Sequence, residues 1–298
     1  MDTEDHAPSS RPQYNKKVGE VIASRREHTL DILPTESVEN HCITIWSDVQ
    51  ATSTQWREYH YSLLDLKEHL AFFWWRFFTV GMSISSALDQ QRLLHLLATI
   101  KQVGHLSPNG TPPLPDTEEP QGRLWVDLPF FQSTLIDTMD STFRGQRETV
   151  PYHGLQEWRN LNMLAARLSV SQTHDLRPCA VLAMRDVLEE EIVVTAVMLE
   201  VVDMWLATCG YWLEEMTAYS LVVQKRYFEP AAVSEGLIYP KKRVSIAPGR
   251  LAKEAGIDSD NVGLSRWRFW RSKLQFLATS DMALSPSAVS ALSHMAEI

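Results

Sequence analysis

The apolar residues of this chain recur at the three-to-four-residue spacing of α-helices over most of its length. Leu66, Leu70 and Phe73 form one such series, and residues at this spacing lie along one face of a helix. Helical patterning runs from 17 to 103 and again from about 127 to 227. No stretch shows the strict alternation of a half-buried strand. The pattern therefore predicts an all-α protein with no substantial sheet.

Proline, glycine and charge mark where the helices stop. Residues 1–16 are rich in Ser, Pro and charge, which is typical of a disordered tail. Residues 104–122 hold five Pro and three Gly, and they predict either a domain boundary or a long surface loop. A final helix pair is expected at about 265–279 and 286–297. We expect one helical domain of about ten packed helices over 17–298, crossed by this Pro-rich loop.

The most apolar stretch begins with LAFFWWRFF and extends over residues 70–88. It approaches the length of a membrane span. However, its single charge, Arg76, would cost roughly 2.5–3.5 kcal/mol near the centre of a membrane. We therefore predict a buried helix that is apolar on all faces, and no membrane span.

The two sides of this helix are expected to differ. Phe73 and Phe77 continue the apolar series of the preceding turns into the core, whereas Trp75 and Thr79 lie on the other side. That second side is either a helix contact or the wall of a ligand pocket. Arg76 should lie at an edge with its guanidinium paired or hydrated, because an unpaired buried charge is too costly.

A second helix can be placed near residues 194–216. Met198, Trp205 and their helical neighbours fall on one side, which is core or pocket, while Glu200 and Asp203 fall on the opposite side. The two carboxylates are therefore expected at a solvated edge and not as a buried acid pair.

Charge and cysteine content narrow the class of protein. The chain has 37 acidic and 28 basic residues, a formal net charge of −9, which argues against a general nucleic-acid binder. The three cysteines, Cys42, Cys179 and Cys209, are far apart and form no CxxC pair. Neither a disulfide framework nor a cysteine zinc site is indicated.

The N-terminus bears on location. It has no apolar stretch behind a basic start, so no secretory signal is predicted and the protein is expected in the cytoplasm. The run Pro240-Lys241-Lys242-Arg243 resembles a nuclear-import signal, although three hydrated cations in a loop need no function.

Two motifs suggest metal chemistry. His174-Asp175 with His153 and Asp203 has the ligand types of helical metal phosphohydrolases. The alternative is a helix N-cap at Asp175 ahead of Pro178 in the first turn, and we favour it. We predict no bound metal.

The second motif is Asp137-Thr138-Met139-Asp140, which resembles the magnesium motif of terpene cyclases. The second metal motif of those enzymes is missing, so the polar face of an amphipathic helix is favoured. The sequence has no Gly-rich dinucleotide or phosphate loop and no known zinc-protease motif. We therefore expect no cofactor.

The ten Trp residues are the most distinctive feature that remains. A Trp side chain can stack on a flat ligand or stabilise developing positive charge, and it can equally pack at a helix crossing. Arg185 and Asp186 follow an apolar run, so one should point inward and the other toward solvent. The residues considered as contacts for a hydrophobic small molecule are Trp75, Trp125, Trp158, Arg185, Trp205 and Trp212.

Four motifs in order resemble a fungal, all-helical family known as a domain of unknown function. The resemblance covers roughly residues 60–297 and implies an intracellular helical protein, with some members in natural-product gene clusters. The motifs are Leu124-Trp125-Val126-Asp127-Leu128-Pro129, Glu157-Trp158-Arg159-Asn160-Leu161-Asn162, Arg185-Asp186-Val187-Leu188-Glu189 and Arg266-Trp267-Arg268-Phe269-Trp270.

Two functions remain open. The first is a cofactor-independent cyclase or isomerase of fungal secondary metabolism that acts on a hydrophobic polyene or terpenoid, with a pericyclic, Diels–Alder-type step as one option. Such a reaction needs a shaped aromatic pocket and a few polar donors. The alternative is a non-catalytic helical interaction protein. A deep apolar cavity would favour the enzyme, whereas a filled core would favour the interaction protein.

Overall fold

The computed structural model describes residues 36–59, 63–104, 124–148, 153–219, 247–258 and 262–295. Every regular element in these ranges is a helix, and the all-α prediction is confirmed. The predicted N-terminal tail, the Pro-rich segment after Gly104 and the basic run 240–243 lie outside the described residues. The helices are α2 (Val38–Tyr59), α3 (Leu63–Ser83), α4 (Ala87–Gln102), α5 (Leu124–Asp127), α6 (Phe131–Glu148), α7 (His153–Val170), α8 (Pro178–Met184), the π-helix η2 (Arg185–Glu189), α9 (Ala196–Tyr219), α11 (Arg250–Glu254), α12 (Leu264–Ser280) and α13 (Ser285–Ser293).

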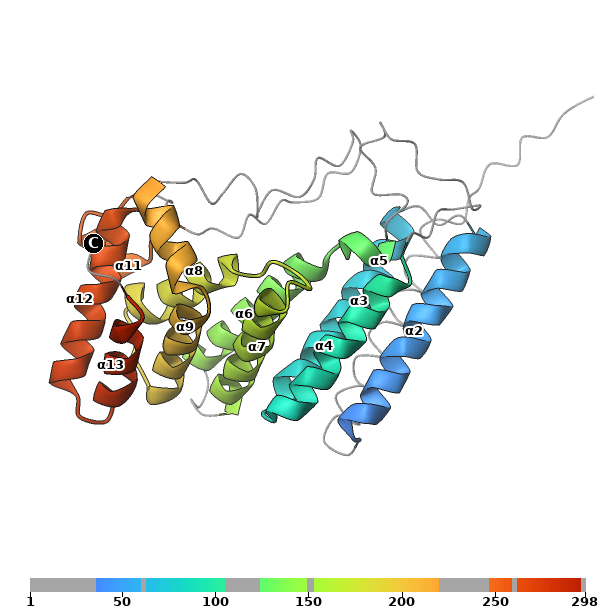
Figure 1. Ribbon diagram of the computed structural model, residues 1–298, viewed down its shortest axis with the longest axis horizontal. Coiled ribbons are helices and arrows are strands. Elements are labelled where there is room, and N and C mark those ends of the chain that lie inside the picture. Colours follow the sequence, from blue (N-terminus) through green and yellow to red (C-terminus); the bar gives the residue numbers. More distant parts are fainter. Residues whose placement is uncertain are drawn as a thin grey trace, which may run out of the picture.

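The helices form a row of successive pairs (Figure 1). Helix α3 contacts α6 and α7, α4 contacts α7, α7 contacts α9, and α9 contacts α12 and α13. Helix α2 lies at one end of the row against α3 and α4, and α12 and α13 form the other end. Because each pair contacts chiefly its neighbours, the packing resembles that of helical-repeat proteins.

Helix α3 is the buried aromatic helix that its sequence predicts. Phe73 and Phe77 are buried in the main core. Trp74 lies edge-on to Phe131 of α6, with ring centroids 4.9 Å apart, and its indole N–H donates to the Pro129 carbonyl at 2.8 Å. Aromatic pairs in this geometry are stabilising beyond the area they bury. The aromatic run therefore joins α3 to the start of α6.

Helix α9 shows the predicted division into an apolar and a polar side. Met198 and Trp205 are buried, whereas Glu200 is exposed and forms an ion pair with Arg159 of α7 at 2.7 Å. Asp203 is partly exposed and lies 3.5 Å from the His294 imidazole. The expectation of a solvated carboxylate edge is correct.

By length and composition, the segment Ala196–Thr217 of α9 is apolar enough to cross a membrane, and it is the one such helix among the described residues. The α3 segment that raised this question in the sequence does not meet the same test. About half of the α9 segment, 56%, is buried inside the protein, and α9 packs against α7, α8 and α13. A core helix has these properties.

Candidate functional site

A buried carboxylate lies at the end of the π-helix η2, where two of the four sequence motifs meet. Glu189 Oε1 accepts hydrogen bonds from Arg266 Nε and Trp270 Nε1, both at 2.6 Å. Glu189 Oε2 accepts from the Gly249 backbone N at 2.7 Å and from Arg266 Nη2 at 3.1 Å. The side chains of Glu189 and Arg266 are fully buried. This Glu189 cluster joins η2 to α11 and α12.

The Glu189 cluster satisfies both carboxylate oxygens, so its chemistry is structural. A buried ion pair is tolerated when additional hydrogen bonds occupy the remaining lone pairs, and Trp270 and Gly249 supply them here. A carboxylate held by four donors in a dry core is not positioned to exchange protons with a substrate. We assign the cluster to the fold and not to catalysis.

Glu189, Arg266 and Trp270 could not be recognised as a cluster from the sequence. Their separations of 77 and 81 positions carry no helical or strand period. One signal was available, because all three residues belong to the motifs of the family resemblance.

Arg185 and Asp186 lie at the other end of η2, and the structure corrects the expectation that they point in opposite directions. Their side chains are similarly buried, with exposed fractions of 14% and 13%, and they form an ion pair with each other. Arg185 Nε and Nη2 both donate to Asp186 Oδ1, at 2.9 and 2.7 Å. η2 is a π-helix, in which backbone hydrogen bonds join residues five positions apart instead of four. The angular spacing of an α-helix, on which the prediction rests, therefore does not apply.

The charges around Arg185 are mostly acidic. Burial by itself lowers the pKa of Arg185, but the carboxylates of Asp186, Glu190 and Asp140 together outweigh burial, so the pKa is raised overall. Asp140 is the last residue of the Asp137–Asp140 motif, and Asp137, the first residue of the motif, is exposed on α6. The motif thus contributes one carboxylate to the surroundings of Arg185.

The Trp residues proposed as ligand contacts are distributed along the row. Trp125 donates to Ser53 Oγ of α2 at 2.8 Å, and Trp205 donates to Asn162 Oδ1 of α7 at 2.9 Å. Both indoles are fully buried, so their N–H groups are satisfied by protein acceptors.

The remaining three Trp candidates also have protein neighbours. Trp158 packs against Phe143 of α6, with centroids 5.0 Å apart. Trp212 lies under the Arg177 guanidinium, whose carbon is 5.0 Å from the ring centroid. Trp75, which is half-buried, stacks on Phe72 with centroids 5.7 Å apart. These contacts involve α6, the turn before α8 and α3 itself, and none of them joins two of the candidates.

The His174-Asp175 dipeptide lies in the turn between α7 and α8. Burial lowers the pKa of His174 to about 4, with a further contribution from Lys101, so the imidazole is neutral near pH 7. Burial alone would raise the pKa of Asp175, but hydrogen bonds from Arg177 lower it overall. The Asp175 carboxylate accepts from Arg177 Nε and Nη2, each at 2.8 Å.

The predicted N-cap at Asp175 is wrong. Arg177 is the residue that precedes α8, and it makes no side-chain capping bond. Among the described residues, no group of three or more His, Cys, Asp or Glu side chains is arranged to hold a metal ion. Burial raises the pKa of the Cys179 and Cys209 thiols to about 12, so both are protonated and poorly nucleophilic.

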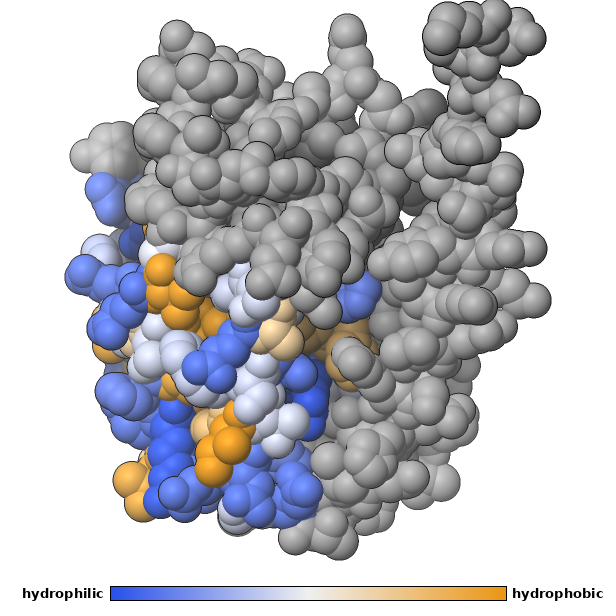
Figure 2. Space-filling view, turned by 90° about the vertical axis from the view of Figure 1, so that its right-hand side faces the viewer, coloured by the Kyte–Doolittle hydropathy of each residue, from blue (hydrophilic) through white to orange (hydrophobic). Residues whose placement is uncertain are grey.

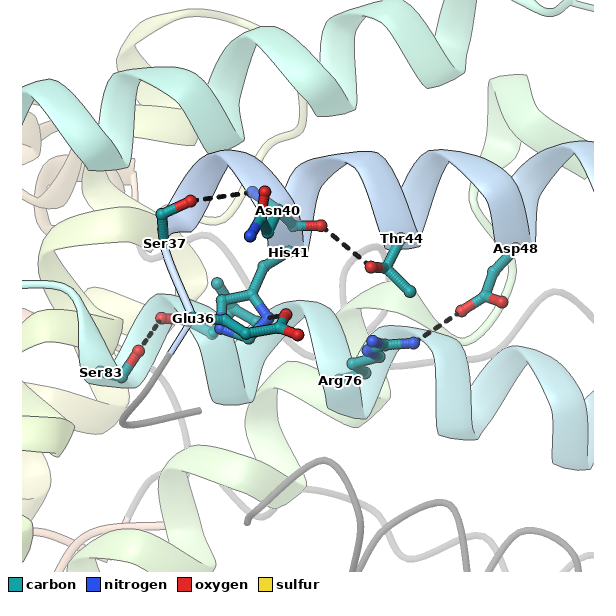
Figure 3. Close-up of polar contacts among 9 residues, drawn as sticks. Glu36, Ser37, Asn40, His41, Thr44, Asp48, Arg76 and Ser83 are labelled. Carbon is teal, nitrogen blue, oxygen red and sulfur yellow. Dashed lines mark hydrogen bonds and ion pairs between the residues drawn. The ribbon is translucent and has the colours of Figure 1, made fainter. Parts of the chain in front are cut away.

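The contact between α2 and α3 contains a buried cation (Figure 3). Arg76 Nη1 donates to Asp48 Oδ2 at 3.0 Å, and Arg76 is 8% exposed. The prediction of a paired guanidinium at a helix edge is confirmed. The Nε atom of Arg76 is buried and has no hydrogen-bond partner. Toward the start of α2, the buried His41 lies 3.6 Å from the Glu36 carboxylate.

These features define an all-α protein built as a row of helix pairs with polar clusters inside it. Residues 74–274 match the model of a family described as "Protein of unknown function (DUF3632)", and the chain belongs to this family. The sequence prediction of a family without assigned function is confirmed to this extent. No curated protein and no solved structure matches the chain significantly.

Proposed function

We propose that this protein is a non-catalytic helical interaction protein. The packing of the Trp side chains supports this function most directly. Trp125 and Trp205, two of the residues expected to line a ligand pocket, are fully buried and donate to Ser53 and Asn162. An indole in this position contributes to the core and has no N–H left for a ligand.

The state of the buried titratable groups supports the same proposal. His174 is neutral with a pKa of about 4, and the thiols of Cys179 and Cys209 have pKa values of about 12. A general acid or base works best with a pKa near the operating pH. These three groups are therefore poorly suited to proton transfer or nucleophilic attack at pH 7.

The elongated row of helix pairs offers an extended surface of the kind that helical-repeat proteins use for partner binding (Figure 1). We expect a protein partner in the cytoplasm, or in the nucleus if the basic run 240–243 acts as an import signal. Nucleic acid is not expected as a partner, given the net charge of −9.

The competing candidate is the cofactor-independent cyclase acting on a polyene or terpenoid in a fungal natural-product pathway. Trp75 favours it, because this side chain is half-buried beside Phe72 and retains area for stacking on an apolar ligand. Arg185, whose side chain is mostly buried and paired with Asp186, would be its polar donor.

A comparison of two variants in the native organism separates the candidates. Trp75→Ala and Arg185→Met remove the two ligand contacts that the cyclase would use, and their melting temperatures are measured first. For folded variants, the interaction account predicts that affinity capture retains the same partner and that extracted metabolites are unchanged. Loss of one cyclised product, with the partner unchanged or absent, would contradict it.

A further inference from the structure

Helix α2 covers the end of the row through a stripe of mixed polarity. Its buried residues, His41, Ile45, Val49 and Ser53, follow one another at four-residue intervals. Two of them are aliphatic and two are polar. Among the described side chains of α2, half of this buried stripe is therefore polar, and the stripe buries less apolar area than a fully aliphatic one would.

The surface of α3 beneath α2 is built to hold a helix that carries a carboxylate. Phe72, Arg76 and Thr79 lie at positions i, i+4 and i+7 of α3 and are all buried. Arg76 reaches across to Asp48 of α2, as Figure 3 shows. Its Nε atom lacks a partner although the residue is more than nine-tenths buried. α2 therefore occupies this surface without satisfying all of its polar groups.

Two further observations concern this end of the row. The family match begins at residue 74, within α3, so it includes Arg76 but neither α2 nor Phe72. On the α2 end of the protein, apolar residues form separate spots among hydrophilic ones (Figure 2). Arg76 of α3 is buried against α2, so a partner helix can pair with it only in the place of α2.

We propose that α2 is an internal, autoinhibitory occupant of a helix-binding groove formed by α3 and α4. Its ligand is an amphipathic helix of a partner protein. The chemistry of that helix follows from α2 itself, in which Ile45, Asp48 and Val49 give the pattern Ile-x-x-Asp-Val. The carboxylate pairs with Arg76, and the aliphatic residues enter the groove. This inference rests on the interaction function proposed above.

A labelled peptide of residues 36–59 serves as the probe for the full-length chain. In the wild-type chain, α2 competes for the groove, so we expect weak binding by fluorescence anisotropy. Asp48→Asn in the chain weakens the competitor but leaves the groove intact. The affinity for the wild-type peptide should then rise at least about tenfold, the change expected from losing one partly buried charge contact.

Three controls define the site. A peptide carrying Asp48→Asn should bind the Asp48→Asn chain no more tightly than the wild-type chain binds the wild-type peptide. A chain carrying both Asp48→Asn and Arg76→Met should likewise show no rise in affinity for the wild-type peptide. Glu200→Gln in the chain should leave peptide affinity unchanged, because Glu200 pairs with Arg159 of α7 at a distance from α2 and the groove. Ile45→Ala weakens α2 without altering the Arg76 pair, and it should also raise peptide affinity. It is the second test if the Asp48 variant fails to fold.

The proposal is overturned if neither Asp48→Asn nor Ile45→Ala binds the peptide better than the wild-type chain. It is also overturned if the gain persists when Arg76→Met is added. A concentration-dependent dimer of the Asp48→Asn chain would show that a second copy exchanges its α2, in place of a partner helix. A chain that keeps a native partner but shows no peptide gain would contradict the α2 inference alone and leave the interaction function intact.

Discussion

Gly249 lies so close to Glu189 that a Cβ atom added to it would be 2.7 Å from the Glu189 backbone oxygen and Cβ. The approach allows the Gly249 backbone N–H to donate to the buried carboxylate at 2.7 Å. Glycine is required here for space and not for backbone conformation, since its φ of −67° is accessible to any residue.

We predict that Gly249→Ala destabilises the protein by about 1–3 kcal/mol, the usual cost of overpacking. Urea denaturation measures the change. Gly263→Ala is the matched control, because nothing lies within 4 Å of the added Cβ and its φ is negative. Both glycines are N-cap residues, so Gly263→Ala should lose only a capping contribution of about 0.5–1 kcal/mol, less than Gly249→Ala. Equal stability of the two variants would contradict the close contact.

Removing the charge of Glu189 should be more severe. Glu189→Gln leaves Arg266 buried without its counter-ion, and we expect a loss of about 3–5 kcal/mol in the free energy of unfolding. Glu191→Gln is the control, since Glu191 pairs with Arg250 on the surface and exposed pairs contribute little. If both variants unfold at the same urea concentration, the Glu189 cluster does not hold α11 and α12 in place.

The depressed pKa of His174 predicts a pH dependence of stability. Its ordinary pKa is 6.5 and its folded value is about 4, so the unfolded chain binds a proton more readily than the folded one. This contribution is complete above pH 6.5 and is lost as the pH falls toward 4. It amounts to at most about 3 kcal/mol.

Urea denaturation between pH 7 and 4 tests this, with His174→Gln expected to flatten the profile. His95→Gln, which alters an exposed imidazole on α4, should retain the wild-type slope. An unchanged slope in the His174 variant would mean that the imidazole remains hydrated in the folded protein.

The Trp residues are predicted to act as core packing. Trp205→Ala removes a buried indole and leaves Asn162 Oδ1 without its donor, so it should cost about 3–5 kcal/mol. Trp75→Ala should cost less, because Trp75 is only half-buried. Polycyclic apolar ligands should not raise the melting temperature of the wild-type protein. A rise that Trp75→Ala abolishes would favour a ligand pocket and the cyclase.

Helical periodicity predicted the parts of the fold that depend on neighbouring turns. The burial of Phe73 and Phe77 follows from their spacing alone, and so does the exposure of Glu200. Arg76 could be placed at a paired edge because an isolated buried charge is too costly. Its partner Asp48 could not be named, because 28 positions separate the two residues.

The polar clusters were less predictable for physical reasons. Arg185 and Asp186 form an ion pair within a π-helix, where the angular spacing of an α-helix does not predict which side of the helix a residue faces. Glu189 finds its partners 60 to 81 positions away, and no local pattern encodes such contacts. Asp175 does not cap α8, because its two carboxylate oxygens accept hydrogen bonds from the Arg177 guanidinium in the same turn.

The mass of the protein as it exists in its cell tests the interaction function most directly. The endogenous chain, tagged and purified gently at low salt, is measured by native mass spectrometry. The account predicts a complex heavier than the 34.0 kDa chain plus its tag, with one protein partner in a fixed ratio. A tagged chain that is found alone and converts a polyene or terpenoid into a cyclised product would contradict it.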